Sequence, residues 1–148
     1  MYRHILVPVD LQEEDLLHRK QALKRALELC RFYQAQLHIL TVVPDLGMPL
    51  VGQYFPENAG DNIIQEAEDS LHRIMASIIP ADITVQYIVA QGSVYRRIID
   101  MAQEVQADLI IMPAHRMKFR DYLLGTNTAR VVRHAQCSVL VLREANFS

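Results

Sequence analysis

The chain has 148 residues, of which 51% are apolar and 22% charged, and its formal net charge is −2. This length suffices for one domain around a single core, so we treat residues 1–148 as one domain. The slight acidity argues against nucleic-acid binding, which needs a broad basic surface. No apolar run approaches the roughly 20 residues of a membrane span and no signal peptide is recognisable, so we expect a cytoplasmic protein without membrane contact.

Two cysteines, Cys30 and Cys137, form no Cys-x-x-Cys pair and have no zinc-ligand spacing with histidines. We interpret them as small apolar side chains in a reducing compartment, and we expect no metal site.

Short apolar runs with little alternation predict strands that are buried on both faces, as in a parallel sheet. The five runs are Ile5–Val7, Leu37–Val43, Ile83–Ala90, Leu109–Met112 and Val139–Leu142. The third run alternates in part, which favours a place nearer the edge of the sheet.

Helical spacing of apolar residues fills the intervals between these strands. The helical stretches are Glu13–Tyr33, Ile63–Ile78, Val94–Val105 and Thr126–His134. We expect a long loop over Asp45–Asn62, which contains two Pro, three Gly and two Asn. Strict alternation of strand and helix predicts an α/β fold, an open five-stranded parallel sheet with helices on both faces, as in Rossmann-like proteins.

Three of the predicted strands are followed by a proline, namely Pro8, Pro44 and Pro113. Because proline cannot donate to a strand ladder, we expect the chain to leave the sheet at each of them. Ligands of open parallel sheets bind beyond the carboxyl ends of the strands, where the strand order reverses. The candidate binding residues on that edge are Pro8, Val9, Asp10, Val42, Met112, Ala114, His115 and Arg116.

Asp10 is either a solvated residue at a loop start or a carboxylate that accepts a hydrogen bond from a nucleobase amino group or a ribose hydroxyl. His115 and Arg116 directly follow the fourth strand, where a structural role and a ligand contact both remain open. The other histidines, His4, His18, His38 and His72, have no recognisable constellation around them, and His134 is explained by the dipole at a helix end.

Gly125, Thr126 and Asn127 open the last helix and form a candidate anion site. A helix N-terminus offers unpaired N–H groups and a favourable dipole, although these residue types also serve as ordinary turn and cap residues. From His115 to His134 five Arg or Lys stand against one acid, Asp121. The pattern therefore indicates a phosphate-bearing ligand.

Several catalytic motifs are absent: the chain has no P-loop, no Gly-x-Gly-x-x-Gly after the first strand and no Gly-x-Ser-x-Gly. No nucleophile–base pair is visible. We therefore assign no catalytic residue, and the candidate residues describe binding better than catalysis.

Four stretches give the chain a resemblance to the universal stress protein family over essentially its whole length. They are the opening ILVPVD, the segment HILTVVPD, the turn QGSV and the final LLGTNTARVVRHAQCSVLVLR. The last is the most specific, because it matches the family's phosphate-binding turn, short helix and final strand together.

This resemblance implies the adenine nucleotide alpha hydrolase-like form of the fold, with ATP, ADP or AMP in the crevice, with or without Mg. It implies that Asp10 lies beside adenine and that Val42 contacts adenine through its backbone. Gly125 and Thr126 match the end of the family motif Gly-x2-Gly-x9-Gly-[Ser/Thr]. It also implies a homodimer through the last strand, Val139–Leu142, and leaves open whether dimers form a tetramer.

The chain departs from that motif at two positions, because Pro113 and Arg116 stand where the family has glycines. Eight residues, Met117–Leu124, separate Arg116 from Gly125, where the motif has nine. A loop of this kind resembles the subgroup of bacterial stress proteins F and G.

Three functions follow as hypotheses. The first is an adenine-nucleotide-binding stress protein that regulates or protects through its dimer. The second is a slow ATPase or self-phosphorylating protein, suggested by the hydroxyls of Thr126 and Thr128. The third is a dimeric interaction module with a degenerate nucleotide site, for which Pro113 and Arg116 are the evidence.

Overall fold

A computed structural model describes residues 1–11, 16–43, 59–114 and 125–143. Five parallel strands form one sheet in the order β3-β2-β1-β4-β5. The strands are β1 (His4–Pro8), β2 (Gln36–Val43), β3 (Val85–Gln91), β4 (Leu109–Pro113) and β5 (Ser138–Leu142). The predicted sheet is confirmed, and β3 lies at its edge as expected.

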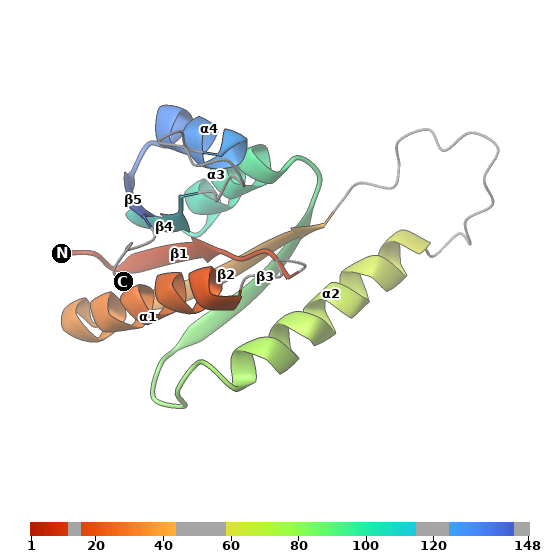
Figure 1. The fold of residues 1–148 in the computed structure, drawn as a ribbon, viewed down its shortest axis with the longest axis horizontal. Helices are drawn as coiled ribbons and strands as arrows, with labels where there is room; N and C mark the ends of the chain where they lie inside the picture. The colour runs from red at the N-terminus through yellow and green to blue at the C-terminus, as the bar shows by residue number, and fades with distance from the viewer. Residues whose placement is uncertain (12–15, 44–58, 115–124, 144–148) are drawn as a thin grey trace.

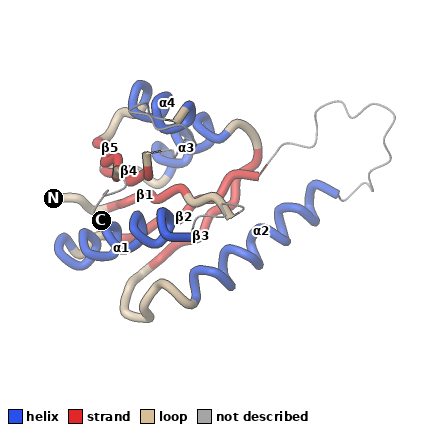
Figure 2. Tube along the Cα trace, viewed as in Figure 1, coloured by secondary structure: helices blue, strands red, loops and turns tan. Residues whose placement is uncertain are grey.

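Four helices cover this sheet, two on each face. They are α1 (Leu16–Tyr33), α2 (Ala59–Ala76), α3 (Val94–Glu104) and α4 (Thr126–His134). Figure 1 shows α1 and α2 on one side of the strands and α3 and α4 on the other, and Figure 2 shows the same layers by element type. None of the helices described is long and apolar enough to cross a membrane.

The strands divide the core into two halves because successive side chains point to opposite faces. In β1, Ile5 and Val7 pack in the cluster that includes α1 and α2, whereas Leu6 packs in the cluster that includes α3 and α4. All three side chains are completely buried. This burial on both faces explains why the strand lacks polar alternation.

The prediction for the second helix and the third strand is wrong at their starts. α2 begins at Ala59, so the last residues of the predicted loop Asp45–Asn62 are helical, while residues 45–58 lie outside the described part. The first turn of α2 is polar and small, so it carries no apolar periodicity. β3 begins at Val85, because Ile83 belongs to a turn in which its N–H donates to the Pro80 carbonyl at 3.2 Å.

Two prolines stay in the sheet as last strand residues, where the sequence predicts that the chain leaves it. Pro8 pairs in register with Leu40, because the following N–H, that of Val9, donates to the Leu40 carbonyl at 2.8 Å. Proline is tolerated there since its nitrogen does not face β2. Pro113 likewise ends β4 in register with Leu142, and Pro44 lies outside the described residues.

Two helices end on a glutamine with a left-handed backbone. Gln34 follows α1 with φ 56° and Gln106 follows the end of α3 with φ 58°. After Gln106, the N–H of Ala107 donates to the Ala102 carbonyl at 2.8 Å, and after Gln34 the N–H of Ala35 donates to the Cys30 carbonyl at 3.0 Å. These are Schellman-type ends, in which glycine is the usual residue.

The amino end of β1 is held by a residue more than a hundred positions away. The Asp108 carboxylate accepts hydrogen bonds from the backbone N–H groups of Arg3 at 2.8 Å and His4 at 3.1 Å. The Asp108 N–H donates to the His4 carbonyl at 2.9 Å. The segment before β4 therefore fixes the start of the central strand.

Candidate functional site

The carboxyl ends of β1 and β4 meet at the point where the strand order reverses. Chain order runs from β1 outward to β2 and β3, then returns to the opposite side of β1 with β4 and β5. Pairing between β1 and β4 joins Ile5 to Leu109 and Leu6 to Ile110 and does not extend to Pro8. Open parallel sheets bind ligands at such a reversal.

Pro8 contributes to the opening between these two strands. Backbone groups of β1 alternate in direction: the Val9 N–H bonds to β2, while the His4 carbonyl bonds toward β4. The nitrogen of Pro8 therefore faces β4, where it has no hydrogen to donate. The edge of β1 beside the reversal offers a carbonyl acceptor without a donor.

The structure places the first group of predicted site residues at the ends of β1 and β2. Val9 is 8% exposed and packs in the core, and its N–H donates to the Leu40 carbonyl. Asp10 follows it and is exposed. Val42 is half-buried near the end of β2 and pairs with Ala90 of β3.

The second group lies at the end of β4 and the start of α4. Met112 is 6% exposed, so its side chain belongs to the core. Ala114 follows β4 and its N–H donates to the Leu142 carbonyl at 2.8 Å. Gly125 is the N-cap of α4 and is buried, and Thr126 and Asn127 begin the helix as exposed residues. The predicted residues His115 and Arg116 lie outside the described residues.

Gly125 has φ −62° and ψ 158°, so this position does not need the left-handed freedom of glycine. No side-chain cap hydrogen bond satisfies the start of α4, and the first bond in the helix runs from the Ala129 N–H to the Gly125 carbonyl at 2.8 Å. The N–H groups of Thr126, Asn127 and Thr128 therefore have no acceptor within the helix. This arrangement can bind an anion.

Thr128 is a residue whose role the sequence interpretation missed. Its side chain is 5% exposed, and its hydroxyl donates to the Pro113 carbonyl at 3.2 Å. This bond ties the first turn of α4 to the end of β4. Thr128 thus positions the start of α4, and its hydroxyl is not directed at solvent as the self-phosphorylation hypothesis requires. In the sequence, the only indication of this role is that a threonine stands two residues after the first residue of the helix.

The sequence interpretation that His4 and His38 have no polar side chains around them is wrong. Nδ1 of His4 lies 3.0 Å from Nε2 of His38, and Nδ1 of His38 lies 2.6 Å from Oε1 of Gln86. His38 is 3% exposed, and burial is the main cause that lowers its pKa; the His4 charge lowers it further and the Gln86 bond opposes both. Sequence alone could not pair these residues, because they meet only through the register of β1, β2 and β3.

His72 also has a neighbour, since its ring centre lies 4.5 Å from that of Tyr87. The side chain of His18 is not among those described. Across the described ranges, no group of three or more His, Cys, Asp or Glu side chains is placed to hold a metal ion.

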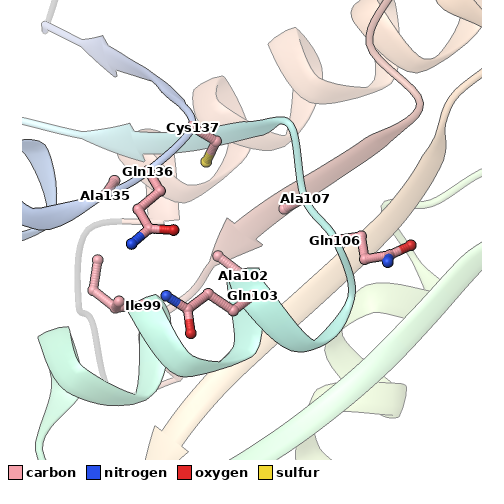
Figure 3. Close-up of a pocket in the computed structure, with 8 residues that line it drawn as sticks. All are labelled: Ile99, Ala102, Gln103, Gln106, Ala107, Ala135, Gln136 and Cys137. Atoms are coloured by element: carbon pink, nitrogen blue, oxygen red, sulfur yellow. The ribbon is translucent and has the colours of Figure 1, made fainter.

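A pocket of about 290 Å³ lies away from the candidate site, at the opposite edge of the sheet. Figure 3 shows it between the second half of α3 and the segment that leads into β5. Its lining is uncharged and comprises Ile99, Ala102, Gln103, Gln106, Ala107, Ala135, Gln136 and Cys137. It contains no predicted site residue.

Both cysteines are free thiols. Cys30 is 2% exposed, and burial raises the pKa of its thiol to about 11. Cys137 is half-buried, and its pKa is raised first by burial and then by the Asp108 charge. Neither thiol is activated as a nucleophile.

An open parallel sheet with a strand-order reversal, and a helix N-terminus beside it, defines an α/β protein of the kind that binds ligands at the carboxyl edge. The chain belongs to the universal stress protein family, whose model matches residues 1–143. The resemblance drawn from the sequence motifs is confirmed.

Two relatives span nearly the whole chain. Universal stress protein G of Salmonella typhimurium is 30% identical over 147 residues, covering 97% of this chain and 100% of the relative. Universal stress protein MJ0531 of Methanocaldococcus jannaschii is 24% identical over 148 residues, covering 97% of this chain and 84% of the relative.

Solved structures share the fold. The hypothetical protein MJ0577 superimposes with a TM-score of 0.77 at 22% identity, covering 99% of each chain. Universal stress protein UspA from Lactobacillus plantarum has a TM-score of 0.68 at 27% identity, covering 96% of this chain and 98% of its own. A universal stress protein in complex with cAMP has a TM-score of 0.58 at 24% identity, covering 96% and 97%.

Proposed function

We propose that this protein binds an adenine nucleotide at the carboxyl edge of the sheet and acts in a stress response as a regulatory or protective homodimer. The observation that carries the proposal is the start of α4, bonded to the end of β4 through Thr128 and Pro113 at the strand-order reversal. The N–H groups of its first turn, which have no acceptor within the helix, suit a phosphate, and Asp10 after β1 suits the base or the ribose.

A relative supports the ligand class, because one universal stress protein of the same fold has been solved in complex with cAMP, an adenine nucleotide. In this chain we assign the base to the ends of β1 and β2, with Pro8, Val9, Asp10 and Val42 around it. We assign the phosphates to Gly125, Thr126 and Asn127, together with Met112 and Ala114 at the end of β4 and with His115 and Arg116, which follow Ala114 in the sequence.

The experiment measures nucleotide affinity by isothermal titration calorimetry with ATP. Asp10→Ala removes a carboxylate that accepts a hydrogen bond from the ligand, so ATP affinity should fall by about tenfold or more. Glu68→Ala is the matched control, because Glu68 is an exposed acid on α2 far along the chain from the site. If both variants bind ATP as the unchanged protein does, the assignment of Asp10 is wrong.

The homodimer rests on β5, which has a neighbour on one side only in the sheet as described. Its residues from Val139 to Leu142 are half-buried and apolar. An unpaired edge of this kind pairs readily with a second copy. The same edge would serve the alternative function, an interaction module, if the nucleotide site were inactive.

A further inference from the structure

The outer surface of α3 and α4 carries two arginines gathered on one aromatic ring. The guanidinium carbon of Arg130 lies 4.9 Å from the ring centre of Tyr95, and that of Arg96 lies 5.7 Å from it. Nε of Arg96 also donates to the Tyr95 hydroxyl at 3.1 Å. We name Tyr95, Arg96 and Arg130 the arginine cluster. The ring orders both guanidinium groups before any ligand arrives.

The charge of this cluster is not neutralised by neighbouring acids. Asp100, the nearest acid along α3, already pairs with Arg97 at 3.0 Å. Neither Arg96 nor Arg130 forms an ion pair with an acid in the part of the chain that the structure describes, and α4 contains no acidic residue. Two positive groups on one ring repel each other, and an anion placed between them would relieve this repulsion.

The cluster lies toward the proposed phosphate site. Tyr95 and Arg96 belong to the first turn of α3, and both α3 and α4 begin at the carboxyl edge of the sheet, as Figure 1 shows. Arg130 lies four residues after Thr126, so the two share one helix face about 6 Å apart along the axis. The Tyr95 ring also lies 6.2 Å from the His134 ring, so the cluster lies beside the second and third turns of α4, beyond Thr126 along the helix.

We propose that the arginine cluster binds the terminal phosphates of the nucleotide, so that the protein prefers ATP and ADP to AMP. The inference rests on the proposed function, because it extends the same site. The N–H groups at the start of α4 hold the phosphate nearest the ribose, and the cluster holds those beyond it. A guanidinium group suits this role since it donates two parallel hydrogen bonds to phosphate oxygens.

The test is calorimetric titration of the full chain with ATP, ADP and AMP in one buffer. Arg130→Gln should weaken ATP binding by about tenfold and leave AMP binding within about twofold of the unchanged protein. Arg133→Gln is the matched control, because it removes the same charge from an exposed position of α4, and the arginines over the Tyr95 ring are Arg96 and Arg130. Its ATP affinity should stay within about twofold.

A second variant distinguishes the effect of holding the arginines on the ring from the effect of their positive charge alone. Tyr95→Leu keeps an apolar side chain between the helices and retains both arginines, yet it removes the ring that holds them. ATP affinity should fall while AMP affinity does not.

Two results would overturn the inference while the proposed function stands: equal losses for ATP and AMP in Arg130→Gln, or the same ATP loss in Arg133→Gln. Absence of binding of all three nucleotides to the unchanged protein would instead refute the proposed function itself.

Discussion

Thr126 and Thr128 lie two residues apart in the first turn of α4 but have different surroundings. Thr126 is exposed at the helix start, whereas Thr128 is buried and donates its hydroxyl hydrogen to the Pro113 carbonyl. The first is therefore open to a ligand, and the second joins the helix to the sheet. Their chemistry is identical, so the difference arises from helix geometry alone.

Thr128→Val removes this hydroxyl with little change in shape and leaves the Pro113 carbonyl without its partner. We expect the free energy of unfolding to fall by about 1 kcal/mol, as measured by urea denaturation. Thr126→Val, at the exposed position, should change it by less than about 0.5 kcal/mol. Equal losses in the two variants would show that the bond does not hold α4 in place.

In the contacts among His4, His38 and Gln86, the donor and the acceptor of each hydrogen bond can be assigned. Oε1 of Gln86 only accepts, so Nδ1 of His38 carries the hydrogen of that bond. Nε2 of neutral His38 then accepts, and Nδ1 of His4 donates to it. A proton added to His38 would bind to Nε2, the atom that now accepts the hydrogen bond from His4, so this bond would be lost.

This arrangement predicts that acid weakens the fold below the ordinary histidine pKa of 6.5. Because burial lowers the pKa of His38 in the folded state, the unfolded chain binds more protons as pH falls through 6.5, and stability declines from there. The free energy of unfolding, followed by urea denaturation from about pH 7.5 to about pH 5.5, should decrease. His38→Gln should flatten this decrease, whereas His134→Gln, at an exposed position, should not.

Among the secondary-structure elements, α1 and α3 end in the same left-handed turn, and in each the left-handed residue is a glutamine, not a glycine. Gln34 and Gln106 adopt φ values of 56° and 58°, where a side chain crowds the following carbonyl. The hydrogen bonds of the Schellman-type ends compensate for this strain. The helix ends were predictable from apolar spacing, but the left-handed turn was not, because glycine is absent there.

Gln34→Gly should relieve the strain and raise the free energy of unfolding by about 1 kcal/mol. The control is Lys24→Gly, at an exposed position within α1, which should lower it by about 1 kcal/mol since glycine is a poor helix former. Thermal and urea denaturation of the two variants should therefore shift in opposite directions. A loss of stability in Gln34→Gly would contradict the strain assigned to this turn.

For the whole molecule, apolar runs and helical spacing predicted the five strands, the four helices and the layered sheet, because both depend on local burial patterns. The start of α2 was missed because its first turn is polar and small, and β3 was predicted to begin too early because Ile83, an apolar residue, belongs to the preceding turn. The arginine cluster and the histidine contacts were missed for a different reason. They join residues from separate elements, such as Tyr95 with Arg130, whose proximity follows from packing.

The proposed dimer can be tested through the backbone of β5. The Leu142 carbonyl accepts from the Ala114 N–H, so the backbone groups of Leu142 face β4. Alternation directs the Val141 N–H toward the free edge. Val141→Pro removes that donor and should convert a dimer to a monomer in sedimentation velocity, with the circular dichroism of the fold retained.

Val141→Thr keeps the N–H and is the matched control, so it should remain dimeric. A proline variant that sediments as a dimer would place the interface elsewhere on the molecule.

The position of β1 has a consequence for how the chain assembles during synthesis. β1 is made first, yet it lies in the centre of the sheet, between β2 and β4. The first 91 residues can form the unit β3-β2-β1, but one edge of β1 stays open until Asp108 and β4 emerge. An open strand edge invites wrong pairing, and closing it requires a contact of long sequence separation. The first strand to be synthesised is thus among the last to be completed.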